Sequence, residues 1–145
     1  MKCIGNKDES AEYRKRPGAY VIITKDNDSK VGIVAKGEQY FYLGGGIEEG
    51  ETQIEALKRE LVEEAGYSIK NVKEFEDIDS YIFSENRGYL EIIANVYTAE
   101  FDERVAEPIE KDHNVIWVEP EEYAGKMYRE WQRYIMQRFI EKRGV

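Results

Sequence analysis

Acidic side chains crowd one short segment of the chain, and their spacing places three of them on one side of a helix. Seven glutamates fall in the seventeen residues from 48 to 64. A helix turns by about 100° per residue, so residues at i, i+3 and i+4 are neighbours, and Glu60, Glu63 and Glu64 have this spacing. Carboxylates this close repel one another unless a cation lies among them. Their oxygen atoms suit Mg²⁺, Mn²⁺ or Ca²⁺ better than Zn²⁺, so the segment predicts a site for a hard divalent cation.

The helix that carries these glutamates has recognisable ends. Thr52 and Glu55 have the spacing of a capping box, and Gly66 supplies the left-handed residue that commonly ends a helix. A glycine-rich loop, residues 43–50, precedes the helix and lets backbone atoms approach a phosphate or a metal. The apolar residues follow a helical period on a different stripe, which we expect to pack in the core: Ile54, Leu57, Leu61 and Ala65.

This segment resembles the Nudix box of the Nudix hydrolase superfamily over the twenty-three residues from 45 to 67. The fixed positions of the motif are filled by Gly45, Glu51, Arg59, Glu60, Leu61, Glu63, Glu64 and Gly66. Tyr67 departs from the aliphatic residue usual in the family, and Gly44 stands where many members carry proline. The resemblance implies a MutT-like Nudix fold, an α/β/α sandwich with a mixed β-sheet, the box helix and a C-terminal helix.

The resemblance also implies a metal-dependent enzyme that hydrolyses the pyrophosphate bond of a nucleoside diphosphate linked to another moiety. It assigns Mg²⁺ or Mn²⁺ to Glu60, Glu63 and Glu64, with the Gly44 carbonyl as a further ligand. One of these glutamates would instead serve as the general base, and the sequence does not distinguish which. Arg59 and Glu51 would pair and hold the carboxylates in place.

Several functions stay open under this reading. The segment before the box is too short for the extra domain of many nucleotide-sugar hydrolases, which favours a nucleoside triphosphate, intact or chemically damaged, as the substrate. An ADP-ribose or dinucleoside-polyphosphate pyrophosphatase is the alternative among enzymes. A catalytically silent Nudix-fold nucleotide sensor is the alternative outside them, although every box glutamate is present. The chain has no EF-hand spacing, which argues against a calcium-binding structural domain.

Candidate residues outside the box are few. We expect Glu110, in the loop before the last strand, to be a further metal ligand, and Lys36, at the end of an earlier strand, to contact a substrate phosphate. His113 is the only histidine, and we expect a solvent-facing polar residue there rather than a base. The basic cluster at 14–16 is expected to be solubilising rather than to steer phosphate. Aromatic residues that could stack on a base, although most should serve packing, are Tyr20, Tyr40, Tyr42, Tyr81 and Tyr97.

Composition narrows the class of protein. The chain has 21 basic and 30 acidic residues and a net charge of −9, which argues against nucleic-acid polymers and anionic membranes as partners. Its single cysteine, Cys3, excludes an internal disulfide and fits a reducing cytosol. No signal peptide or membrane span is recognisable. We therefore expect a cytoplasmic protein that acts on a small nucleotide, with a monomer and a homodimer as the alternative assemblies.

Length and periodicity predict the elements that must position these residues. The 145 residues fit one Nudix domain over 1–145, with the first dozen loosely held. Strands are predicted at 18–25, 30–36, 38–43, 72–76, 78–83, 89–101 and 114–118. Besides the box helix, a short helix is predicted from 119 and a longer one from beyond Gly125 to about Lys142. Its buried stripe is predicted to hold Met127, Tyr128, Trp131, Ile135 and Phe139.

Overall fold

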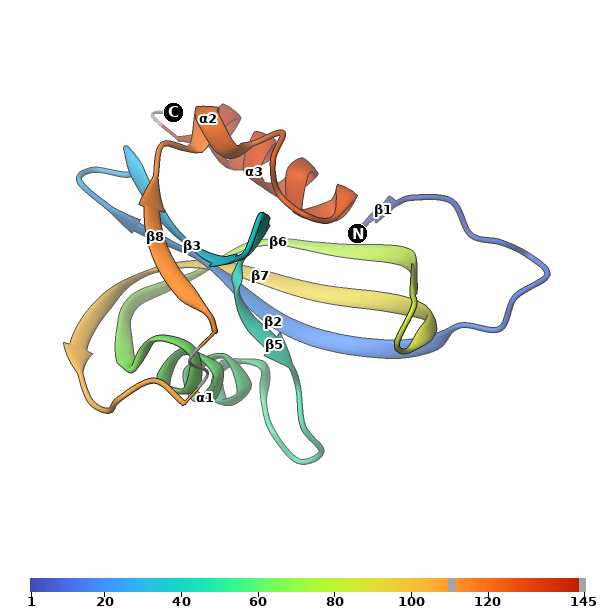
Figure 1. Cartoon of the computed structure of the whole chain (residues 1–145), viewed down its shortest axis with the longest axis horizontal. Helices are drawn as coiled ribbons and strands as arrows, with labels where there is room; N and C mark the ends of the chain where they lie inside the picture. The colour runs from blue at the N-terminus through green and yellow to red at the C-terminus, as the bar shows by residue number, and fades with distance from the viewer. Residues whose placement is uncertain (110–111, 144–145) are drawn as a thin grey trace.

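A mixed β-sheet lies between helices on both of its faces (Figure 1). The computed structural model describes residues 1–109 and 112–143, and within these ranges eight strands join one sheet. The strands are β1 Lys2–Ile4, β2 Arg14–Lys25, β3 Lys30–Lys36, β4 Gln39–Phe41, β5 Leu43–Gly46, β6 Tyr67–Ser84, β7 Gly88–Arg104 and β8 Asn114–Val118. The helices are α1 Gln53–Ala65, α2 Pro120–Tyr123 and α3 Glu130–Lys142.

Strand β2 is the centre of the sheet. The strand order is β1-β6-β7-β2-β3-β4, with β5 paired to β2 and β8 paired to β3. One edge of β2 runs parallel to β7, with Arg14 opposite Leu90. Its other edge pairs antiparallel first with β5, where Tyr20 lies opposite Gly44, and then with β3. The glycine-rich segment is therefore the last part of a strand fixed to the middle of the sheet.

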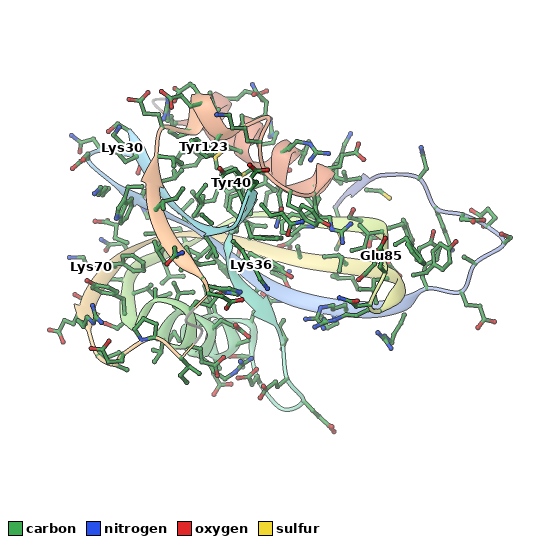
Figure 2. All side chains as sticks on the ribbon, viewed as in Figure 1. Lys30, Lys36, Tyr40, Lys70, Glu85 and Tyr123 are labelled. Carbon is green, nitrogen blue, oxygen red and sulfur yellow. The ribbon has the colours of Figure 1, made fainter. Side chains whose placement is uncertain are left out.

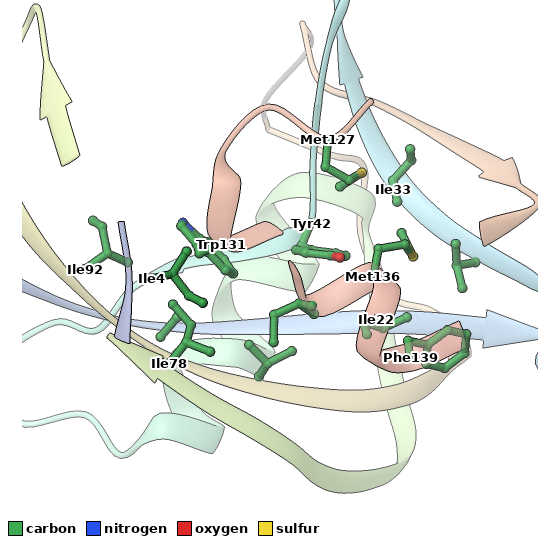
Figure 3. Packing of buried hydrophobic residues seen from close by; sticks show 14 of the residues in the cluster. Ile4, Ile22, Ile33, Tyr42, Ile78, Ile92, Met127, Trp131, Met136 and Phe139 are labelled. Carbon is green, nitrogen blue, oxygen red and sulfur yellow. The ribbon is translucent and has the colours of Figure 1, made fainter. Parts of the chain in front are cut away.

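The two faces of β2 enter two separate hydrophobic clusters, because successive side chains of a strand point to opposite faces. Ile22 packs under α3 in the cluster shown in Figure 3, together with Tyr42 and Trp131. Val21 and Ile23 pack on the other face against Leu57 and its neighbours on α1. The sheet thus holds the box helix below and the C-terminal helix above in the view of Figure 1.

The predicted fold class and most predicted elements are confirmed. Strands β3 and β8 have the predicted bounds, and α1 begins with the Thr52–Glu55 capping box and ends at Gly66, whose φ is 76°. Residues 90, 92, 94 and 96 of β7 are buried on one face as the alternation predicts. No described helix has the length and apolar character that crossing a bilayer requires.

Four element predictions are wrong. The segment 38–43 divides into β4 and β5 around Tyr42, and 72–76 with 78–83 form the single strand β6, which has bulges. The first dozen residues are not all loosely held, because Lys2–Ile4 pairs with β6 and buries Ile4. Tyr128 is 41% exposed, so it is not part of the buried stripe, and it precedes α3, which begins at Glu130.

Candidate functional site

Two glycines allow strand β5 to pack closely, Gly44 against β2 and Gly45 against the box helix α1. Gly44 has φ of +126°, and a Cβ there would lie 2.2 Å from the carbonyl oxygen of Ala19. A Cβ on Gly45 would lie 2.7 Å from the carboxyl carbon of Glu60. A side chain at either position would collide with β2 or with α1, so glycine is what brings the helix carboxylates against the strand backbone.

Arg59 is the cation at the centre of the carboxylate cluster. Its guanidinium binds Glu51 through two hydrogen bonds, Nε to Oε2 at 2.8 Å and Nη2 to Oε1 at 3.0 Å. Its Nη1 donates to Glu60 Oε1 at 2.9 Å and lies 3.5 Å from Glu63 Oε2. Its Nη2 also donates to the Gly46 carbonyl at 3.0 Å, which ties the helix to the loop that precedes it. The predicted Arg59–Glu51 pair is therefore confirmed as a contact.

The same contacts shift the acidity of both partners. The hydrogen bond from Arg59, with a second from the backbone at Glu48, holds the pKa of Glu51 below its ordinary value. The hydrogen bond to Glu51 raises the pKa of Arg59, and the contact with Glu60 raises it further. Both groups are therefore charged at neutral pH, and their pairing fixes the loop, the helix and Glu60 in one arrangement.

Glu64 is the buried carboxylate of the cluster. Only 5% of the residue is exposed, and its Oε1 accepts a hydrogen bond from the backbone N–H of Gly44 at 2.8 Å. The Nδ1 atom of His113 lies 3.4 Å from its other oxygen, Oε2. His113 therefore does not face solvent as predicted, because the loop before β8 turns it toward the box helix.

The three glutamates at i, i+3 and i+4 have different surroundings, although they lie on one side of α1. Glu60 faces Gly45 and Arg59, Glu63 lies at the outer side of Arg59, and Glu64 points to Gly44 and His113. Across residues 1–109 and 112–143, no three acidic, histidine or cysteine side chains converge closely enough to enclose an ion in this conformation. The Arg59 guanidinium lies among the carboxylates instead, which shows that the cluster is built around positive charge.

A pocket of about 380 Å³ begins at this cluster and extends beneath α3. Gly44, Gly45, Glu64 and His113 line one side of it. Its floor is aromatic: the ring of Trp131 lies 5.0 Å from that of Tyr20 and 6.0 Å from that of Tyr42, centroid to centroid. Basic side chains complete the wall, from Arg16, Lys36, Arg87 and Arg129. The pocket therefore combines flat apolar surface with positive charge beside the carboxylates.

Several of these pocket residues are corrections to the sequence analysis. Arg16 belongs to β2 and lines the pocket, so it is not part of a loose, solubilising terminus. Trp131 is buried in the core as predicted, and it also lines the pocket. Arg87 and Arg129 were not predicted at all, since they come from the β6–β7 turn and the residue before α3, where no local motif marks them.

The remaining predicted residues have mixed placements. Lys36 lines the pocket and pairs with Asp112 Oδ2 at 3.3 Å; Figure 2 shows it near the centre of the molecule. Its predicted contact with a substrate phosphate stays a prediction. Glu110 lies outside the described residues, so its predicted role as a metal ligand stays a prediction.

Comparison with known proteins gives one family and one fold. Residues 14–139 match the NUDIX domain family. Among solved structures, MutT from Aliivibrio salmonicida and Vibrio cholerae is 19% identical with a TM-score of 0.68, covering 89% of this chain and 99% of that one. A MutT protein from Bacillus halodurans is 21% identical, with a TM-score of 0.69 and coverages of 84% and 80%. A NUDIX hydrolase from Nitrosomonas europaea is 16% identical, with a TM-score of 0.71 and coverages of 90% and 91%. At these identities the likeness shows a shared fold.

Proposed function

The chain belongs to the Nudix family of pyrophosphohydrolases, and from this we propose that it hydrolyses a nucleoside diphosphate linked to another moiety, with Mg²⁺ or Mn²⁺ as the cofactor. The observation that carries the proposal is the position of Glu64. A carboxylate with 5% exposure faces a glycine backbone at one end of a pocket large enough for a nucleotide. Burial of an acidic group beside more carboxylates is costly unless a cation binds there.

The donor atoms suit a divalent metal ion. Glu60, Glu63 and Glu64 would hold it, with the Gly44 carbonyl as a further ligand, and all of these donors are hard oxygens. A bound divalent cation supplies neutralisation of phosphate charge and activation of water. The cluster is oxygen-rich, whereas a zinc site would use cysteine or histidine, so magnesium or manganese fits best.

Other residues of the site would orient the metal ligands and bind the substrate. Arg59 and Glu51 orient Glu60 and the glycine loop through their paired hydrogen bonds. Lys36 and Arg16 lie on the pocket wall, where they would contact the phosphates of the substrate. Tyr20 is only partly buried, and its ring, packed on the buried ring of Trp131, would contact the base.

We propose a nucleoside triphosphate, intact or chemically damaged, as the first substrate to test. The likeness to MutT proteins and the small aromatic pocket support this choice. An ADP-ribose or dinucleoside-polyphosphate substrate would have to extend beyond a pocket of about 380 Å³.

The test is release of nucleoside monophosphate and phosphate products from a nucleotide panel, with Mg²⁺ or Mn²⁺ and with EDTA. We expect Glu64→Gln and Glu63→Gln to lower kcat by about 100-fold or more, because each removes charge from the metal site. Glu49→Gln is the matched control, since Glu49 is an exposed glutamate of the same loop. Equal turnover by wild type and both site variants would reject the mechanism. Tight nucleotide binding by a wild type without turnover would instead identify a sensor.

A further inference from the structure

The pocket carries more positive charge than the chain around it. Its described charged lining consists of Arg16, Lys36, Arg87 and Arg129 against Glu64, with the single His113 beside it. The whole chain, by contrast, has a net charge of −9. A local reversal of sign in a concave site raises the concentration of anionic ligands there.

Three of these arginines have guanidinium groups with no hydrogen bond or ion pair to any residue in 1–109 or 112–143. They are Arg16, Arg87 and Arg129, and all three line the pocket. The other six of the nine arginines in the sequence donate to carboxylates or carbonyl oxygens of described residues: Arg14, Arg59, Arg104, Arg133, Arg138 and Arg143. The Arg129 guanidinium lies over the ring face of Tyr128, 4.7 Å from its centroid. Donors that the fold leaves unused in a pocket are available to a ligand.

Arg16 belongs to the same end of the pocket as the carboxylates. Its Nη2 would lie 3.4 Å from a Cβ on Gly46, the residue whose carbonyl Arg59 binds. In the function proposed above, it would contact the scissile pyrophosphate. Arg87 comes from the turn between β6 and β7, and Arg129 is the residue before α3.

The start of α3 lies near strand β6, away from α1, as Figure 1 shows. A Cβ on Gly5 would lie 3.2 Å from the carbonyl oxygen of Tyr81 and 3.8 Å from Glu130 Oε1. Glu130, the residue after Arg129, therefore lies near Tyr81 of β6. Tyr81 is three residues before Ser84, where β6 ends. Arg87 follows Ser84 in the turn, and Glu85 of the same turn is labelled in Figure 2.

Arg87 and the glutamate end belong to one pocket. Tyr20, Arg16 and Glu64 line it together with Arg87. One bound molecule can therefore contact both the glutamate end and the turn that carries Arg87.

We propose that Arg87 and Arg129 bind a second anionic group of the substrate, separate from the scissile pyrophosphate. The proposal rests on the function proposed above and narrows its substrate class. All phosphates of a plain nucleoside triphosphate lie in one chain, so its sugar and base would offer these two guanidinium groups only uncharged acceptors. A nucleotide that carries a further phosphate on its ribose offers each of them a charged acceptor. The preferred substrates are then pyrophosphates of ribose-phosphorylated nucleotides.

The kinetic test uses matched substrates that differ only in this group. Adenosine 3′-phosphate 5′-triphosphate is compared with ATP, and guanosine 3′-diphosphate 5′-triphosphate with GTP, through kcat/KM at fixed Mg²⁺. We expect the phosphorylated member of at least one pair to be preferred about tenfold or more, the value of a charged hydrogen bond. Arg87→Ala and Arg129→Ala should each remove most of that preference. Arg104→Ala is the charge-matched control, because Arg104 pairs with Glu107 outside the pocket, and should retain it.

A binding test without turnover separates this proposal from the hydrolysis it rests on. Adenosine 2′,5′-bisphosphate and AMP are titrated by calorimetry in EDTA, with inorganic phosphate as a third ligand. Tighter binding of the bisphosphate, lost in Arg87→Ala, supports the second subsite even if no substrate in the panel is hydrolysed. Equal binding of the two nucleotides overturns it. Inorganic phosphate that binds as tightly as the bisphosphate, with the same Arg87 dependence, shows a site for free anions and also overturns it.

Discussion

Replacing Gly45 with alanine should damage the metal site while leaving the fold nearly intact. The added Cβ would lie 2.7 Å from the Glu60 carboxyl carbon and 2.8 and 3.0 Å from its two oxygens. Ordinary contact begins near 3.4 Å, so the carboxylate must move by about 0.7 Å, the difference from 2.7 Å. Gly45 is not among the glycines with positive φ, so alanine adds no backbone strain there.

The displacement of Glu60 sets the size of the effect. It stretches or breaks the 2.9 Å hydrogen bond from Arg59 Nη1 to Glu60 Oε1. A hydrogen bond to a charged group contributes about 1.5–3 kcal/mol, and a group misplaced by close to 1 Å lowers a catalysed rate up to about 100-fold. We expect kcat/KM to fall about 10- to 100-fold and the free energy of unfolding to fall by only about 1–2 kcal/mol.

Magnesium titrations of hydrolysis, run beside urea denaturation in EDTA, separate the two effects. Gly50→Ala is the first control: Gly50 has φ of +85° and nothing within 4 Å of a new Cβ, so it should lose about 1 kcal/mol of stability and no activity. Gly44→Ala is the second, because its Cβ meets the Ala19 carbonyl at 2.2 Å and should prevent folding. The reasoning is refuted if Gly45→Ala keeps wild-type kcat/KM, or loses activity only in proportion to unfolded protein.

Three other variants test the contacts around the site. Arg59→Met should lower the free energy of unfolding by about 2–3 kcal/mol in EDTA, because it leaves the carboxylates without their cation. With saturating Mn²⁺ the loss should be smaller. Urea midpoints of the variant that do not depend on the metal would contradict this. The pKa of Glu51 is lowered in the fold by Arg59, so the ionised carboxylate stabilises the protein above its ordinary pKa of 4.5, and this stabilisation is lost as the pH falls through the lowered value. Urea midpoints measured from about pH 6 to pH 3 should therefore fall less steeply in Glu51→Gln than in wild type, and parallel curves would exclude the pair as a source of acid sensitivity. Tyr42→Phe removes the 2.7 Å hydrogen bond from the buried hydroxyl to the Gln132 carbonyl and should cost about 1 kcal/mol in thermal denaturation; no change in Tm would show that bond to be unimportant.

The parts of the site that follow from local spacing could be predicted from the sequence. Thr52 and Glu55 cap α1 as expected, and Arg59 binds Glu51 as expected, because each pair lies within a few turns of one helix and its entry loop. Gly44 and Gly45 lie at a fixed, short distance along the chain from the helix, since β5 leads directly into that loop. Within this segment, distance along the chain fixes distance in space.

The pocket wall could not be predicted in this way. Arg16 reaches the pocket because β2 pairs in parallel with β7, which sets it opposite Ile92. Arg129 reaches it because α3 packs across the sheet, and His113 because the loop before β8 turns back to Glu64. Each placement depends on the pairing of strands far apart in sequence, for which a single chain offers no periodic signal.

The predicted break within β6 is wrong for a different reason. Polar residues near Asp77 favour a break between two short strands, whereas the structure continues β6 through them with bulges. A bulge accommodates an unpaired residue without ending the strand, so a polar interruption does not distinguish it from a turn.

The position of β2 between β5 and β7 has a consequence for biosynthesis. A nascent chain can pair β5 with β2 and dock α1 when fewer than half of its residues have left the ribosome, since these elements end at Ala65. Strand β7, which must find β2 in parallel from a distant part of the chain, and α3 emerge later. Because closing long loops is entropically slower than closing short ones, we expect vectorial synthesis to assemble the cation-binding half of the enzyme first and to complete substrate selection last.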